Sequence, residues 1–140
     1  MAMKVLTETQ NYFPARTEEP LASLQLNIRG REFNLKHARM GNDFVFGIGT
    51  NCLLAVPAKR VSALRGCIPN QIEQLQLVDF LTLQKTPVRL ELEVDGKKSS
   101  SWLLNITGNW LRISTRTGVE WVHSSALVMA RIGPVHNPMQ

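Results

Sequence analysis

Apolar and polar residues alternate along two stretches of the chain that lie far apart in the sequence. Residues 24–30 read LQLNIRG and residues 90–96 read LELEVDG, so every second position is apolar until a glycine ends each pattern. Alternation with a period of two is typical of a half-buried strand, because successive side chains of a strand point to opposite sides. Both stretches are therefore expected to be strands, each followed by a tight turn.

The order of these signals indicates that the chain contains one unit twice. Gly41-Asn42 follows the first strand pattern and recurs as Gly108-Asn109 after the second, with apolar alternation behind both pairs. Residues 13–66 and 80–132 then align as two copies, and such a repeat governs any prediction of the fold. Further pairs in the same order are residues 56–65 with 122–131, Phe13 with Phe80, and Pro20 with Pro87.

Turn residues cut both copies into short apolar segments, which predicts four or five strands in each. Two further segments leave a choice: residues 58–64 are either a helical turn or an edge strand, and residues 126–132 are either a strand or a helix. The expected strands are residues 24–28, 33–40, 43–48 and 52–56 in the first copy, and residues 88–94, 101–106, 110–115 and 119–123 in the second.

The segment between the copies is open to two interpretations. Pro69-Asn70 is a plausible helix start, and the residues after it form a face of mixed polarity. Residues 75–83, in contrast, are apolar at every second position except Asp79, as in a strand. We favour a short connecting helix followed by a strand.

The expected fold is mainly β, with two similar small barrels in tandem or one duplicated sheet. A unit of this size is marginally stable alone, so the two copies are expected to pack together or to oligomerise. The expected organisation is an N-terminal arm (1–19), a first β unit (20–66), a connector (67–79), a second β unit (80–133) and a tail (134–140).

The net charge of +5 is unevenly distributed and favours an anionic partner. Residues 1–66 hold nine Lys/Arg against five Asp/Glu, whereas residues 67–140 hold seven against six. Nucleic acid is the first candidate for such a partner, and an ordinary basic surface is the alternative.

Cysteine usage and hydropathy place the chain in the cytoplasm by default. Cys52 and Cys67 form no CxxC pair, and reduced, buried thiols are the simplest interpretation. No apolar run is long enough to span a membrane, and the sequence MAMKVLTETQ lacks the apolar core of a signal peptide. We expect no metal, no cofactor and no membrane partner.

Two local motifs resemble those of small Sm-like or SH3-like barrels. Trp121-Val122-His123 has the aromatic-x-His order of the second motif of bacterial Sm-like RNA chaperones, and residues 126–128 supply the apolar strand that follows it. Val94-Asp95-Gly96 resembles the glycine bend of the first motif. The first copy has Leu54-Ala55-Val56-Pro57 in place of the aromatic-x-His. The resemblance implies two SH3/Sm-like barrel units and RNA binding.

Basic residues of the first copy are candidates for a face that contacts phosphates without sequence specificity. Lys36 and Arg39 lie beside the central turn, and Lys59, Arg60 and Arg65 follow the fourth expected strand. An ordinary solvated surface is the alternative interpretation.

Aromatic residues of the second copy supply the remaining candidates. Trp110 directly follows a turn and is expected to be the exposed tryptophan, whereas Trp102 and Trp121 are expected to be packed. Arg112 lies on the same expected strand as Trp110. His123 adjoins aromatic and apolar residues and is a candidate for stacking on a nucleotide or for a hydrogen bond to phosphate, although a histidine without a role is the simpler interpretation.

The sequence contains none of the common enzyme motifs that we considered. It has no nucleophile elbow, no glycine-rich phosphate loop and no metal-binding histidine spacing, and Glu91 and Glu93 are expected to be solvated. The sequence therefore favours a non-enzymatic binding module for RNA or single-stranded nucleic acid. The alternative is a protein-interaction or structural subunit that forms a homo-oligomer with no nucleic-acid role.

Overall fold

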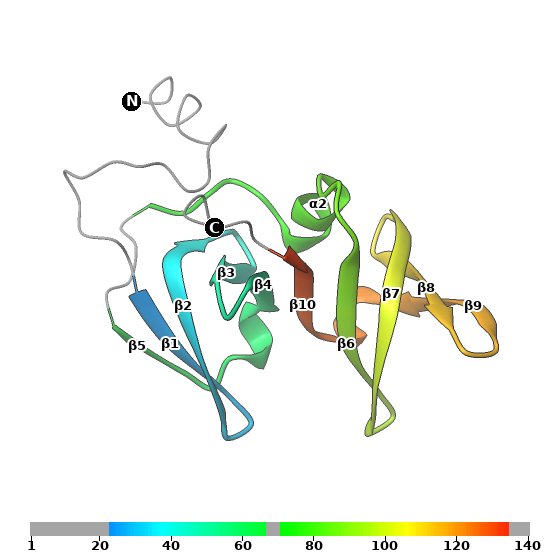
Figure 1. Ribbon diagram of the computed structural model, residues 1–140, viewed down its shortest axis with the longest axis horizontal. Helices are drawn as coiled ribbons and strands as arrows, with labels where there is room; N and C mark the ends of the chain where they lie inside the picture. The colour runs from blue at the N-terminus through cyan, green and yellow to red at the C-terminus, as the bar shows by residue number, and fades with distance from the viewer. Residues whose placement is uncertain (1–22, 67–70, 135–140) are drawn as a thin grey trace.

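The computed structural model describes residues 23–66 and 71–134, and ten strands in it form one antiparallel sheet (Figure 1). The mainly β expectation is confirmed. The expected arm (1–19), Cys67, the helix start at Pro69-Asn70 and all but the first residue of the expected tail lie outside the described residues. The elements are β1 (Ser23–Ile28), β2 (Arg31–Met40), β3 (Phe44–Ile48), β4 (Cys52–Pro57), η1 (Ala58–Arg60), β5 (Ala63–Gly66), α2 (Leu77–Thr82), β6 (Val88–Val94), β7 (Lys97–Thr107), β8 (Trp110–Thr115), β9 (Gly118–His123), η2 (Ser124–Ala126) and β10 (Leu127–Pro134).

The alternating patterns form the strands that they predict. In β1 the apolar residues are buried and the residues between them are partly exposed, and β6 has the same alternation in its first five residues. The hairpin between β6 and β7 turns at Asp95-Gly96, where both residues have positive φ (52° and 80°). Such angles match the twist of a two-residue hairpin, and glycine adopts them without strain.

The sheet is open, with the strand order β5-β1-β2-β3-β4-β10-β6-β7-β8-β9. The expected closure into two barrels is thus not shown. Strands β1–β5 belong to residues 23–66, which we call the N-terminal half, and β6–β10 belong to residues 71–134, the C-terminal half. The halves join where β4 pairs with β10, so that Ala55 lies opposite Ala130 and Leu53 opposite Ile132.

A helix occupies most of the segment for which the alternation predicts a strand. The short connecting helix that the sequence favours is present as α2, although it begins later than the expected start at Pro69-Asn70. The alternative strand over residues 75–83 is wrong, since α2 covers six of these residues, and the expected domain boundary between residues 79 and 80 falls inside the helix. Asp43 explains part of this difference, because its side-chain Oδ1 accepts a hydrogen bond from the backbone N–H of Leu77 at 2.8 Å. The first turn of the helix is thereby capped by a residue distant in sequence.

The two segments with open alternatives each contain a short 3-10 turn followed by a strand. In the first, η1 precedes β5, and in the second, η2 precedes β10. Both interpretations of residues 58–64 are therefore partly right, and residues 126–132 form mainly a strand. β7 is longer than expected because it begins immediately after the hairpin at Asp95-Gly96.

The buried apolar residues of the described ranges form two cores, and the larger one spans both halves. The smaller core holds the inward residues of β1, such as Leu24 and Leu26, together with Leu35 and, from β10, Met129. The larger core lies on the opposite side of β3 and β4 from the smaller core. There, residues of these two strands pack against α2 and against the buried residues of the C-terminal half. Its residues include Phe44, Phe46, Leu53, Ala55, Leu77, Phe80, Leu81, Leu90, Leu111 and Ala130.

Three phenylalanines fix α2 against the sheet. The ring centroid of Phe80 lies 4.7 Å from that of Phe46 and 5.2 Å from that of Phe44. Gly41 makes room for this cluster, because a Cβ atom at that position would clash with the Phe44 ring. The connector is also bonded to the turn after β2, with Asn42 N–H donating to the Leu75 carbonyl at 2.8 Å.

We predict that Phe80→Ala destabilises the protein by about 3–5 kcal/mol, because it removes a buried ring from the core that spans both halves. Urea denaturation followed by tryptophan fluorescence measures the change in the free energy of unfolding. Leu83→Ala is the matched control, since Leu83 follows the same helix and its side chain is 58% exposed. Equal effects of the two substitutions would contradict the role assigned to Phe80.

Candidate nucleic-acid interface

The basic residues predicted in the N-terminal half do not form one continuous cationic face. Lys59 and Arg65 are exposed on η1 and β5, and Lys36 is exposed on β2. Arg39 forms an ion pair with Glu73, with 3.3 Å between its Nη1 and the carboxylate Oε2. That pairing neutralises one of the five predicted cations.

Arg60 links the two halves. Its guanidinium donates to the Ser125 carbonyl at 2.7 Å and to the Leu127 carbonyl at 3.1 Å, and its Nη1 lies 3.7 Å from Glu93. Since its donors are engaged with backbone and carboxylate groups, Arg60 stabilises the contact between η1 and η2. Arg39 and Arg60 are therefore structural cations in this conformation.

The predicted residues of the C-terminal half, in contrast, lie together on one side of the sheet. Trp110 is paired with His123, and Arg112 with Trp121, across β8 and β9. Residues directly opposite in a pair of strands point to the same side. Leu111 and Ile113 point the other way and are buried, so the side that carries Trp110 and Arg112 faces solvent.

Three tryptophans share this solvent-facing side. Trp102 on β7 is opposite Ser114 on β8, which places it on the same side as Trp110 and Trp121. Trp102, Trp110 and Trp121 are 46%, 50% and 48% exposed. Trp110 is exposed as expected, whereas Trp102 and Trp121 are not packed in a core, which corrects the prediction for both.

Cationic groups accompany the indole rings. The Arg89 guanidinium carbon lies 5.2 Å from the centroid of the Trp102 ring, and Arg89 Nε donates to Ser100 Oγ at 2.8 Å. Arg112 is the cross-strand neighbour of Trp121. We call the set formed by Arg89, Trp102, Trp110, Arg112, Trp121 and His123 the tryptophan face.

His123 contacts Trp110 and is held by the turn that follows β9. The two rings meet edge to face, with 5.2 Å between centroids and an interplanar angle of 89°. His123 Nδ1 accepts a hydrogen bond from the Ser125 backbone N–H at 3.1 Å. In the neutral ring this bond leaves the proton on Nε2, which makes Nε2 the donor of the imidazole.

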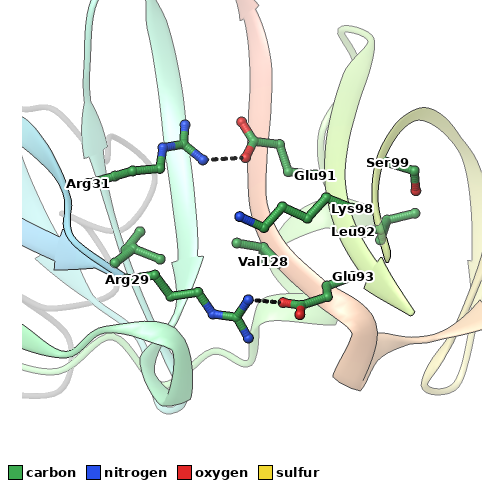
Figure 2. A pocket seen from close by; sticks show the side chains of 9 residues that line it. Arg29, Arg31, Glu91, Leu92, Glu93, Lys98, Ser99 and Val128 are labelled. Atoms are coloured by element: carbon green, nitrogen blue, oxygen red, sulfur yellow. Dashed lines mark hydrogen bonds and ion pairs between the residues drawn. The ribbon is translucent and has the colours of Figure 1, made fainter. Parts of the chain in front are cut away.

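A cluster of charged side chains lies between the two halves and lines a shallow pocket beside the hairpin that connects β1 and β2 (Figure 2). Arg31 pairs with Glu91 at 3.1 Å, and Arg29 pairs with Glu93. Lys98 extends into the space between these two pairs (Figure 2). The expectation that Glu91 and Glu93 are simply solvated is wrong, because both carboxylates are half-buried and paired with arginines across the joint.

The Arg29 guanidinium controls the ionisation of Glu93. Its hydrogen bond is the main reason that the pKa of Glu93 lies below the ordinary value of 4.5, and partial burial opposes this shift. The positive charges of Arg29, Arg60 and Lys98 lower the pKa further. The carboxylate is thus held in its charged form, which favours its ion pairs with the arginines.

Metal ligation finds no support within residues 23–66 and 71–134. No group of three His, Cys, Asp or Glu side chains in these ranges is placed to hold a metal ion. Cys52, on β4, is a half-buried free thiol. Among the same residues, no helix has the length and apolar character needed to cross a membrane.

Strict application of strand alternation would have found the residues that the sequence prediction missed. Trp121 and His123 are two positions apart on β9, and Val122 between them points toward the core. Trp121 and His123 therefore both lie on the solvent-facing side. Trp102 gave no such signal, because β7 contains a bulge between Leu103 and Asn105 that interrupts the alternation.

We predict that the stabilising effect of Glu93 is present at pH values above 4.5 and is lost as the pH falls through the lowered pKa. The folded state binds this proton less tightly than the unfolded state, so acidification favours unfolding. The difference in Tm between the wild type and Glu93→Gln is expected to be largest near neutral pH and to shrink in acid. Glu32→Gln, at an exposed position of β2, is the control, and a difference independent of pH would contradict the assignment.

Comparison of the chain with protein-family models, with curated proteins and with solved structures found no match.

Proposed function

We propose that the chain is a non-enzymatic module that binds RNA or single-stranded DNA on its tryptophan face. The observation that carries the proposal is the presence of three half-exposed indole rings on adjacent strands, with Arg89 and Arg112 beside them. Unpaired bases offer π faces that stack on exposed aromatic rings. Arginines next to those rings contact phosphates or stack on the bases themselves.

The geometry favours single strands over a duplex. The tryptophan face lies on the outer side of β7, β8 and β9, and extended strands present side chains in rows that match successive unstacked bases. A duplex buries its base faces and leaves mainly phosphates for recognition. Contact with a phosphate contributes little binding energy to an indole ring. Base stacking is therefore the simplest explanation for the exposure of the three tryptophans.

We further propose that the two halves are tandem copies of one SH3/Sm-like unit, each a small barrel that is incompletely closed. In each half the pairing order is fifth, first, second, third and fourth strand. β4 and η1 also correspond to β9 and η2 at a constant offset of 66 residues, at both bounds of each element. In the second copy the outer face of the third and fourth strands is free to bind a ligand.

We predict that Trp110→Ala weakens binding to labelled single-stranded RNA by about 5- to 150-fold, the loss of roughly 1–3 kcal/mol expected for one stacked base. Fluorescence anisotropy at low salt measures the dissociation constant. Quenching of tryptophan emission on binding is expected in the wild type, because bases stack directly on the rings. No binding of RNA or DNA even at low salt would refute the proposal.

Arg112→Ala is expected to reduce the salt dependence of nucleic-acid binding and to leave the stacking of bases on the tryptophans unchanged. Each phosphate contact on a single strand contributes roughly 0.7 to the slope of log K against log salt, so losing one contact lowers the slope by about that amount. Lys59→Ala is the matched control, because Lys59 is an exposed cation on η1 and is not one of the six residues of the tryptophan face. If Lys59→Ala weakens binding as much as Arg112→Ala, general attraction by the +5 charge explains the binding instead.

A further inference from the structure

The short turn η2 depends on hydrogen bonds for its position, because none of its three residues is buried. The Ser124 backbone N–H donates to the Asn109 carbonyl at 2.8 Å, and Asn109 directly precedes Trp110. The Ser125 backbone N–H donates to His123 Nδ1 at 3.1 Å, and the His123 ring meets the Trp110 ring edge to face. The position of η2 therefore affects both rings at this end of the tryptophan face.

Arg60 fixes η2 from the side of the N-terminal half. Its Nη2 donates to the Ser125 carbonyl at 2.7 Å, and its Nε donates to the Leu127 carbonyl at 3.1 Å. The Ser125 backbone is thus held at both of its polar groups, by His123 at the N–H and by Arg60 at the carbonyl. The Arg60 side chain is only 18% exposed, so phosphates of a ligand have little access to it.

We propose that Arg60 is a positioning residue of the tryptophan face, acting through η2 on the His123 ring and, through that ring, on Trp110. In this role the N-terminal half controls the nucleic-acid site of the C-terminal half, so the assignment rests on the proposed function. Without Arg60, the Ser125 backbone is less constrained, and the two rings lose the support that fixes their contact. An indole that is not fixed in advance loses more conformational entropy when a base stacks on it.

The comparison of η1 with η2 indicates that Arg60 is not a general requirement of the repeated unit. At the offset of 66 residues that relates these two turns, Arg60 corresponds to Ala126. The second copy forms the same turn with an alanine at this position. Arg60 therefore belongs to the contact between the halves, where its guanidinium reaches the turn that His123 caps.

A double-mutant cycle between Arg60 and Trp110 tests this role by fluorescence anisotropy with labelled single-stranded RNA at low salt. Arg60→Ala is expected to weaken binding by about fivefold, because stacking on Trp110 is impaired. In a Trp110→Ala background the same substitution is expected to have less than about a twofold effect, since the ring on which Arg60 acts is gone. An equal factor in both backgrounds, which a folding defect would also produce, would overturn the role.

The salt dependence of binding separates positioning from direct contact with phosphate. Arg60→Ala is expected to leave the slope of log K against log salt unchanged, whereas loss of one phosphate contact lowers it by roughly 0.7. Arg60→Lys keeps the positive charge but not the planar pair of donors, so it is expected to bind RNA more weakly than the wild type. A lowered slope in Arg60→Ala, or wild-type affinity in Arg60→Lys, would overturn the role.

Arg29→Ala is the matched control for the loss of an ion pair between the halves. Arg29 pairs with the same Glu93 carboxylate as Arg60, and it is not a partner in the hydrogen bonds described for η2. Arg29→Ala is therefore expected to bind RNA like the wild type. Equal weakening by Arg29→Ala and Arg60→Ala would assign the effect to the charges at Glu93 and overturn the role of η2.

Nuclear Overhauser effects between the ring protons of Trp110 and His123 report on positioning without any RNA. They are expected in the wild type and in Arg29→Ala, and they are expected to weaken in Arg60→Ala. Unchanged effects in Arg60→Ala would overturn the positioning role even if RNA binds to the tryptophan face. A wild type that binds no RNA refutes the proposed function and, with it, the part of Arg60 in binding, so the two failures are distinguishable.

Discussion

The pairing of β4 with β10 is the constraint on which the rest of the structure depends. It turns ten short strands into one sheet, and it carries the outer face of the N-terminal half into the core of the C-terminal half. Phe44 and Phe46 would be exposed on an isolated N-terminal half, but here they lie beneath α2 and against Phe80. A small unit gains most from such sharing, because it buries too little surface by itself.

Ion pairs between the two halves reinforce the contact that β4 makes with β10. Glu91 and Glu93 on β6 each bind two arginines, and three of these four arginines come from the N-terminal half. Exposed pairs contribute little individually, but a network on a half-buried surface fixes the relative position of the elements that it connects. Apolar contact thus supplies the stability of the joint, and the charges favour one arrangement of the halves over others.

The strand pattern was predictable from the sequence because alternation in LQLNIRG and LELEVDG reports which face is buried. A short helix between the halves was also predictable, but its position at Leu77–Thr82 was not, because Asp43 and Phe44, which cap and cover it, lie more than 30 residues before Leu77. The same distinction holds for the candidate site. Trp110 and His123 follow from local pattern, whereas the pairing of Arg39 with Glu73 depends on tertiary contacts that no local pattern contains.

The shared core has a consequence for synthesis of the chain. β4 is complete once Pro57 has been made, yet its partner β10 ends at Pro134 and is the last described strand to leave the ribosome. Until then the nascent chain presents one unpaired edge of β4. Contacts of such long sequence separation close slowly. The growing chain therefore passes through a stage in which binding by a chaperone, or premature contact with a neighbouring nascent chain, competes with its own folding.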